Sequence, residues 1–114
     1  MRWPVLTEED EQAVLGVMRR NETSLSDEPI KLEKEFSEYL GADYALAEVN
    51  GTAALYAALF ALGVGPGDEV ICPSYTYWAS AMPAATLGAK VVFCEVCPDS
   101  LDLDVEDFNR KITP

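Results

Sequence analysis

Residues 50–53 of this 114-residue chain, Asn-Gly-Thr-Ala, have the types and order needed to hold a phosphate group. They lie between a predicted strand and a predicted helix. A glycine at such a point lets the backbone approach an anion, while amides at the start of the helix and the Thr52 hydroxyl can donate hydrogen bonds to it. The segment is therefore a candidate phosphate cradle, although its spacing alone favours an ordinary turn in which Thr52 caps the helix.

A second segment, residues 73–78, combines three aromatic rings with two hydroxyl-bearing residues in the order Pro-Ser-Tyr-Thr-Tyr-Trp. It follows another predicted strand. Flat rings at the carboxyl end of a strand can stack on a planar heteroaromatic ligand. Packing into the core is the alternative role, and from the sequence alone it is the commoner one for aromatic side chains.

Two other patterns point away from known cofactor motifs. Gly63, Gly65 and Gly67 follow a helix and precede a strand, which is the reverse of a dinucleotide-binding loop, and no P-loop lysine is present. A small nucleotide-binding protein is therefore disfavoured. Cys94 and Cys97 have the spacing of redox and zinc motifs but close an apolar strand and have no second ligand pair. We expect no metal site, and structural thiols that are buried or half-buried.

The charge balance excludes further classes. Lys and Arg number 8 against 20 Asp and Glu, the net charge is -12, and histidine is absent. We expect so acidic a chain to be repelled by nucleic acids and anionic membranes, and no Ser-His-Asp or Cys-His pair can form within it. No apolar stretch is long enough to cross a bilayer and no basic leader begins the chain, so we expect a cytoplasmic protein.

The elements that position these segments follow from hydrophobic periodicity. Two amphipathic helices are expected first, over residues 8–20 and 29–40, with a capping box at residues 7–10 and a left-handed stop at Gly41. The remainder alternates strand and helix in the order β-α-β-α-β-α: 44–49, 53–62, 69–72, 77–87, 90–95 and 105–111. Continuously apolar strands predict an α/β fold with mainly parallel strands. The helix over 53–62 is apolar on nearly every side and is expected to be buried.

Seven motifs resemble, in order and spacing, the amino-terminal portion of the DegT/DnrJ/EryC1/StrS sugar aminotransferases. They are Leu32-Glu33-Lys34-Glu35-Phe36, Tyr39-Leu40-Gly41, Asn50-Gly51-Thr52-Ala53-Ala54-Leu55, the run from Leu62 to Ile71, Pro73-Ser74-Tyr75-Thr76, Leu87-Gly88-Ala89 and Pro98-Asp99-Ser100-Leu101. Members of this family are pyridoxal-phosphate enzymes of fold type I. The resemblance implies a helical segment over 1–41 and an incomplete, three-layer large domain of that fold over 42–114.

The resemblance also implies which residues bind the cofactor. The family's Ser-Gly-Thr phosphate motif corresponds to Asn50-Gly51-Thr52, and Gly51, Thr52 and Ala53 are the residues expected to bind the phosphate, with Thr52 and Ala53 in contact with it. Tyr77 corresponds to the aromatic residue that covers the pyridine ring. Asn50 stands where the family has a small hydroxyl residue. The Schiff-base lysine and the aspartate that pairs with the pyridinium nitrogen correspond to positions beyond residue 114, so the resemblance assigns no catalytic residue to this chain.

The implied function is that of an amino-terminal fragment, inactive alone, of an enzyme that transfers an amine from an amino acid to a keto-sugar nucleotide. Pyridoxal 5'-phosphate is expected to be absent from the isolated chain or weakly bound. We also expect self-association into a homodimer or larger oligomer, or a rearranged sheet that pairs strand 44–49 with strand 69–72. The alternative function is a stand-alone, non-catalytic α/β binding or interaction module.

Overall fold

The computed structural model describes residues 5–113, which divide into two compact units. The first ends at Ala47 and the second begins at Glu48. The predicted division between residues 41 and 42 remains a prediction. Every helix within the described residues is too short or too polar to cross a bilayer.

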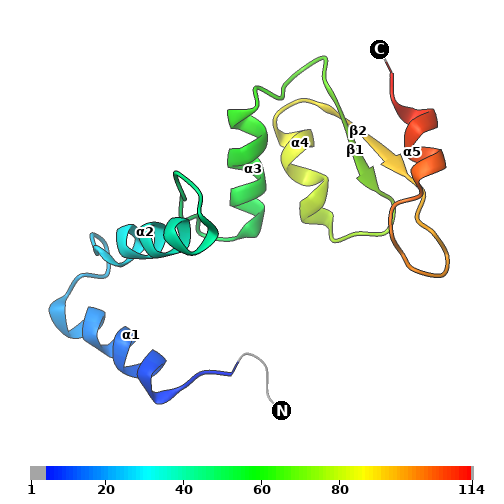
Figure 1. The fold of residues 1–114 in the computed structure, drawn as a ribbon. Coiled ribbons are helices and arrows are strands. Elements are labelled where there is room, and N and C mark those ends of the chain that lie inside the picture. The colour runs from blue at the N-terminus through cyan, green and yellow to red at the C-terminus, as the bar shows by residue number, and fades with distance from the viewer. Residues whose placement is uncertain (1–4, 114) are drawn as a thin grey trace. The chain divides into compact units, whose positions relative to one another are not determined.

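The first unit holds two amphipathic helices, α1 (Glu8–Arg20) and α2 (Glu28–Leu40), as the periodicity predicts (Figure 1). The predicted capping box is present at the start of α1. Thr7 Oγ1 accepts from the amide of Asp10 at 3.3 Å, and the Asp10 carboxylate accepts from the amide of Thr7 at 2.7 Å. Gly41 ends α2 with φ 65°, as expected.

The strand predicted over residues 44–49 does not form. These residues have no strand partner, and the amide of Ala47 instead donates to the carboxylate of Glu33 at 2.9 Å. A strand is stable only when a neighbour satisfies its backbone groups, and the two strands of the second unit pair with each other. The rearranged sheet suggested by the sequence is therefore wrong.

The second unit contains two parallel strands, β1 (Glu69–Pro73) and β2 (Lys90–Cys94). In their register Glu69 lies opposite Lys90 and Cys72 lies opposite Phe93. The other elements of this unit are α3 (Gly51–Ala61), the 3-10 helix η1 (Trp78–Ser80), α4 (Met82–Thr86) and α5 (Val105–Lys111). The prediction of an α/β fold with parallel strands is confirmed.

The single helix predicted over residues 77–87 is divided into η1 and α4. Pro83 is the cause, because proline has no amide hydrogen to continue a helical ladder and restricts the residue before it. A proline is tolerated in the first turn of a helix, and Pro83 lies there in α4. The chain therefore makes a short 3-10 turn and starts a new helix.

The core of the second unit is small and contains mostly short side chains. Its buried apolar residues are Cys72, Ala79, Pro83, Ala84, Ala89 and Cys94. Cys97 is half-buried, so the predicted placement of all three thiols is confirmed. Burial raises the pKa of the Cys72 and Cys94 thiols. Within residues 5–113 no group of three or more metal-ligating side chains lies close enough to hold an ion.

The expectation that the apolar helix is buried is wrong. No residue of α3 is buried, and Phe60 is 67% exposed. The elements packed on α3 are η1 and α4, two short pieces that cover one side of it. An apolar composition favours burial of a helix, but the helix is buried only where neighbouring elements offer enough surface to cover it.

Helix α5 is fastened to β2 by polar contacts. The carboxylate of Asp107, a buried residue, accepts from the amide of Glu95 at 2.8 Å and pairs with Lys111 Nζ at 3.0 Å. Lys111 Nζ also donates to the carbonyl oxygen of Phe93 at 2.6 Å. These contacts hold the pKa of Asp107 well below its usual range, chiefly through the Glu95 amide.

Candidate functional site

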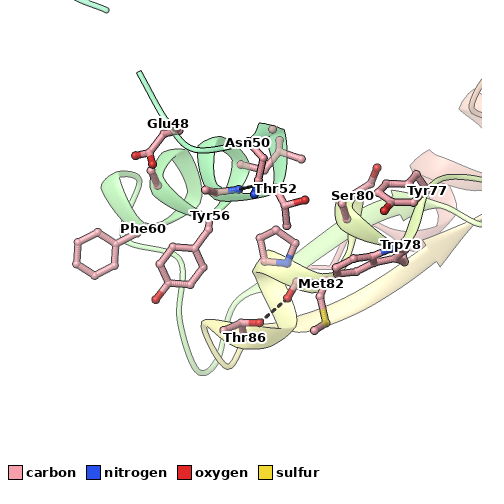
Figure 2. Close-up of a pocket in the computed structure, with 16 residues that line it drawn as sticks. Glu48, Asn50, Thr52, Tyr56, Phe60, Tyr77, Trp78, Ser80, Met82 and Thr86 are labelled. Atoms are coloured by element: carbon pink, nitrogen blue, oxygen red, sulfur yellow. Dashed lines mark hydrogen bonds between the residues drawn. The ribbon is translucent and has the colours of Figure 1, made fainter. Parts of the chain in front are cut away.

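An open groove of about 1370 Å³ lies in the second unit between α3 and the η1–α4 segment (Figure 2). Residues 50–53 line it from the start of α3, and residues 77–80 line it from the opposite side. Residues 50–53, and residues 77 and 78 of the second segment singled out by the sequence, therefore meet in one groove. All four predicted site residues are among its lining: Gly51, Thr52, Ala53 and Tyr77.

Asn50, and not Thr52, caps α3. Its backbone is extended, with φ -166° and ψ 171°, and its Oδ1 accepts from the amide of Ala53 at 2.9 Å. The first amides of a helix have no intrahelical acceptor, and among the described residues no acceptor contacts those of Gly51 and Thr52. Two amides therefore remain available at the groove, while that of Ala53 is engaged by the cap.

The start of α3 has room for an anion. A Cβ built on Gly51 would meet no atom within 4 Å, so the space beside these amides is open. The amino end of a helix carries a partial positive charge, and Thr52 adds a hydroxyl donor. These residues fit a phosphate group.

Among residues 5–113, the lining of the groove contributes no cation. Glu48 is the one ionised side chain among the lining residues, and neither lysine nor arginine is present there. A phosphate in the groove would be held by amides and hydroxyls of these residues, and any neutralising cation would come from elsewhere. The sequence already indicates this, because residues 35–89 include no lysine or arginine.

The aromatic side of the groove is exposed rather than packed into the core. Tyr75, Tyr77 and Trp78 are 69%, 68% and 55% exposed. The rings of Tyr77 and Trp78 lie with centroids 5.4 Å apart and planes tilted by 52°. Tyr77 and Trp78 both line the groove. Because both side chains are exposed, they do not pack into the core formed by the described residues.

Sequence reasoning did not assign several of the lining residues. Trp78 and Ser80 also line the groove; the aromatic cluster at the end of the strand is the signal for Trp78, and nothing in the sequence singles out Ser80. The far end is lined by Tyr56 and Phe60, whose rings stack at 6.5 Å with an interplanar angle of 7°. Their spacing of four residues on a helix is the signal for that pair. Figure 2 shows both rings projecting from α3 on the same side.

The proteins to which this chain is similar include several aminotransferases. A UDP-2-acetamido-2-deoxy-3-oxo-D-glucuronate aminotransferase of Pseudomonas aeruginosa is 43% identical over 98 residues, an alignment that covers 86% of this chain and 27% of that protein. The structure of an aminotransferase from Psychrobacter cryohalolentis superposes with a TM-score of 0.88 at 35% identity, covering 99% of this chain and 29% of the other.

A Streptococcus pneumoniae protein solved in a PLP form has a TM-score of 0.85 at 31% identity, covering 96% of this chain and 28% of that one. The chain thus spans less than a third of the length of each of these relatives. Its α/β arrangement is part of the fold type I architecture that the aminotransferase structures share. The sequence profile of the DegT/DnrJ/EryC1/StrS aminotransferase family matches residues 4–114, and the chain therefore belongs to that family.

Proposed function

We propose that this chain is the amino-terminal part of a pyridoxal-phosphate-dependent nucleotide-sugar aminotransferase. In that enzyme, the residues that line the groove would hold the phosphate of the cofactor and cover its ring. The observation that carries the proposal is the single groove in which Asn50–Ala53 and Tyr77 meet in a member of this family. When bound, pyridoxal phosphate supplies an electron sink for chemistry at the amine-bearing carbon.

Phosphate binding falls to the start of α3. The amides of Gly51 and Thr52 and the Thr52 hydroxyl are the donors that the cap leaves available. The predicted contact of Ala53 requires its amide to be shared between the phosphate and Asn50 Oδ1, or the cap to open. Gly51 keeps the approach clear, since a side chain there would project into the open space.

Ring binding falls to Tyr77. Its phenol ring is exposed at the groove and can stack on a planar pyridine while keeping water from that face. The role is the same as that implied by the sequence resemblance. We assign no proton transfer to any residue of this chain.

The reactants are proposed from a relative. The Pseudomonas aeruginosa protein acts, by its name, on a UDP-linked oxo sugar, so we propose a keto-sugar nucleotide as amine acceptor and an amino acid as donor. None of the four lysines, Lys31, Lys34, Lys90 and Lys111, lines the groove. We therefore propose that the covalent anchor and the pyridinium partner belong to sequence beyond residue 114. By themselves the 114 residues should lack aminotransferase activity and bind the cofactor weakly.

Binding can be tested with pyridoxamine 5'-phosphate, because it lacks the aldehyde that would react with surface lysines. Titrated into the 114-residue chain and followed by NMR, it should shift the amides of Gly51 and Thr52, whereas pyridoxamine, which lacks the phosphate, should not. Thr52→Val should weaken the phosphate-dependent shifts several-fold. Thr86→Val, at the far end of the same groove, is the matched control and should not. Equal responses to the two ligands would refute the cradle.

The fragment proposal is tested separately by the DNA downstream of the codon for Pro114. An open reading frame that encodes an aspartate and a lysine in the family's later motifs would support it. A stop codon directly after Pro114 would contradict it and favour the stand-alone binding module.

A further inference from the structure

Trp78 lies beside the ring that the proposed function assigns to the cofactor. The sequence includes it only as one of three rings that could stack on a ligand, and the family resemblance assigns the stacking position to Tyr77. We infer that Trp78 is a positioning residue: its indole restricts the rotamers of Tyr77 and holds the phenol ring at the groove. The restriction itself does not depend on the proposed function. Its use, which is to present Tyr77 to a planar ligand, rests on that function.

The backbone around Tyr77 is already fixed. The carbonyl of Tyr77 accepts from the amide of Ser80 at 2.9 Å, and that of Trp78 accepts from the amide of Ala81 at 3.1 Å. Ala79 is 6% exposed and anchors the turn in the core. The Thr76 and Ser80 hydroxyls, 2.9 Å apart, are hydrogen-bonded across it. The freedom that remains to Tyr77 is rotation of its side chain.

The Tyr77 side chain has little else to hold it. It is 68% exposed, and among the described residues its hydroxyl has no hydrogen-bond partner. Within residues 5–113 its ring pairs with that of Trp78 alone, with ring centroids 5.4 Å apart and planes tilted by 52°. That separation and tilt lie within the range of favourable aromatic pairs. Figure 2 shows the two rings next to each other at one end of the groove.

A restricted ring favours ligand binding. An exposed tyrosine side chain exchanges among staggered rotamers within nanoseconds. Stacking on a ligand restricts it to one rotamer. A neighbour that already limits those rotamers reduces the entropy lost on binding. Trp78 would thus strengthen cofactor binding without touching the cofactor.

The first experiment needs no ligand. Side-chain couplings and nuclear Overhauser effects of Tyr77 are measured by NMR in the 114-residue wild type and in the Trp78→Leu and Trp78→Phe variants. We expect one dominant Tyr77 rotamer with contacts to the indole in the wild type, averaged couplings in Trp78→Leu, and a largely retained rotamer in Trp78→Phe. Averaged couplings in the wild type, or an unchanged rotamer in Trp78→Leu, would overturn the inference.

The second experiment separates positioning from direct contact. Trp78→Leu should weaken pyridoxamine 5'-phosphate binding roughly 2- to 12-fold when Tyr77 is present, and should have no effect in a Tyr77→Ala background. An equal loss in both backgrounds would mean that Trp78 itself touches the ligand, which contradicts the inference. If the ligand-free couplings change as expected but the wild type does not distinguish pyridoxamine 5'-phosphate from pyridoxamine, the proposed function fails and the restriction of Tyr77 by Trp78 stands.

Discussion

Asn50 decides how the start of α3 is built, because its side chain accepts the Ala53 amide that would otherwise face the groove. The residue thus has two consequences at once: it stabilises the helix, and it leaves the amides of Gly51 and Thr52 as the available donors. A neutral side chain suits this position, since a carboxylate in its place would repel a phosphate.

Replacing Asn50 with alanine removes the acceptor and should lower the free energy of unfolding of the second unit by about 1 kcal/mol. Asn50→Ser keeps a capping oxygen and should recover most of that loss. Urea unfolding followed by circular dichroism measures both. Equal stability of Asn50→Ala and the wild type would show that the cap contributes nothing.

Asp107 predicts a pH dependence. Because the Glu95 amide and the Lys111 and Arg110 ion pairs hold its pKa below the ordinary value, the stability it contributes is fully present above about pH 4 and is lost as the pH falls through the lowered pKa. Asp107→Asn should therefore unfold at lower urea than the wild type at pH 7, and the difference should shrink at pH 3.

The matched control for Asp107 is Asp99→Asn, an exposed aspartate that makes no ion pair among the described residues. It should follow the wild type at both pH values. A difference between Asp107→Asn and the wild type that stays constant from pH 7 to pH 3 would exclude the ion pairs as its cause.

At the scale of elements, the connection between α4 and β2 depends on Gly88. Its φ is 86°, a left-handed conformation that is costly for residues with a Cβ, and a Cβ there would lie 3.1 Å from Pro66 Cγ. The turn that ends α4 therefore contacts the turn that precedes β1 at Gly88, a position that requires glycine.

Gly88→Ala should destabilise the second unit by roughly 1–2 kcal/mol from the backbone conformation alone. Gly65→Ala is the control, because Gly65 has no left-handed φ and its nearest atom, the carbonyl oxygen of Leu87, is 3.9 Å from the added Cβ. Thermal unfolding compares the two. Equal losses in both variants would contradict the argument.

At the scale of the whole molecule, the main feature is the number of large apolar side chains that are exposed to solvent. Phe60 and Leu62 are 67% and 79% exposed, and the two-stranded sheet has an unpaired edge on each strand among the described residues. Contiguous apolar surface and free strand edges favour association in water.

We therefore predict that the 114-residue chain self-associates. Sedimentation velocity should show species larger than the 12.5 kDa monomer, increasing with concentration, and Phe60→Lys should shift the distribution toward the monomer. Glu106→Lys on α5 adds the same type of side chain away from α3 and should have a smaller effect. A stable wild-type monomer at high concentration would rule out the prediction.

Local chemistry made much of this protein predictable from its sequence. The Thr7–Asp10 capping box, the stop at Gly41 and the limits of α5 all follow from residue types at short spacing. The parallel direction of β1 and β2 follows from the alternation of apolar strands with helices along the chain. The two segments of the groove were predicted in the same way, since strand ends with glycine, hydroxyl or aromatic residues attract ligands.

Only the tertiary structure decided what depends on neighbours distant along the chain. Residues 44–47 form no ladder with any described residue, and α3 stays exposed because η1 and α4 cover one side of it. The same holds for the site, because the fold brings residues 50–53 and residues 77–80 together in one groove. Propensity and spacing act within a few residues, whereas burial and pairing require surfaces that only the folded chain brings together.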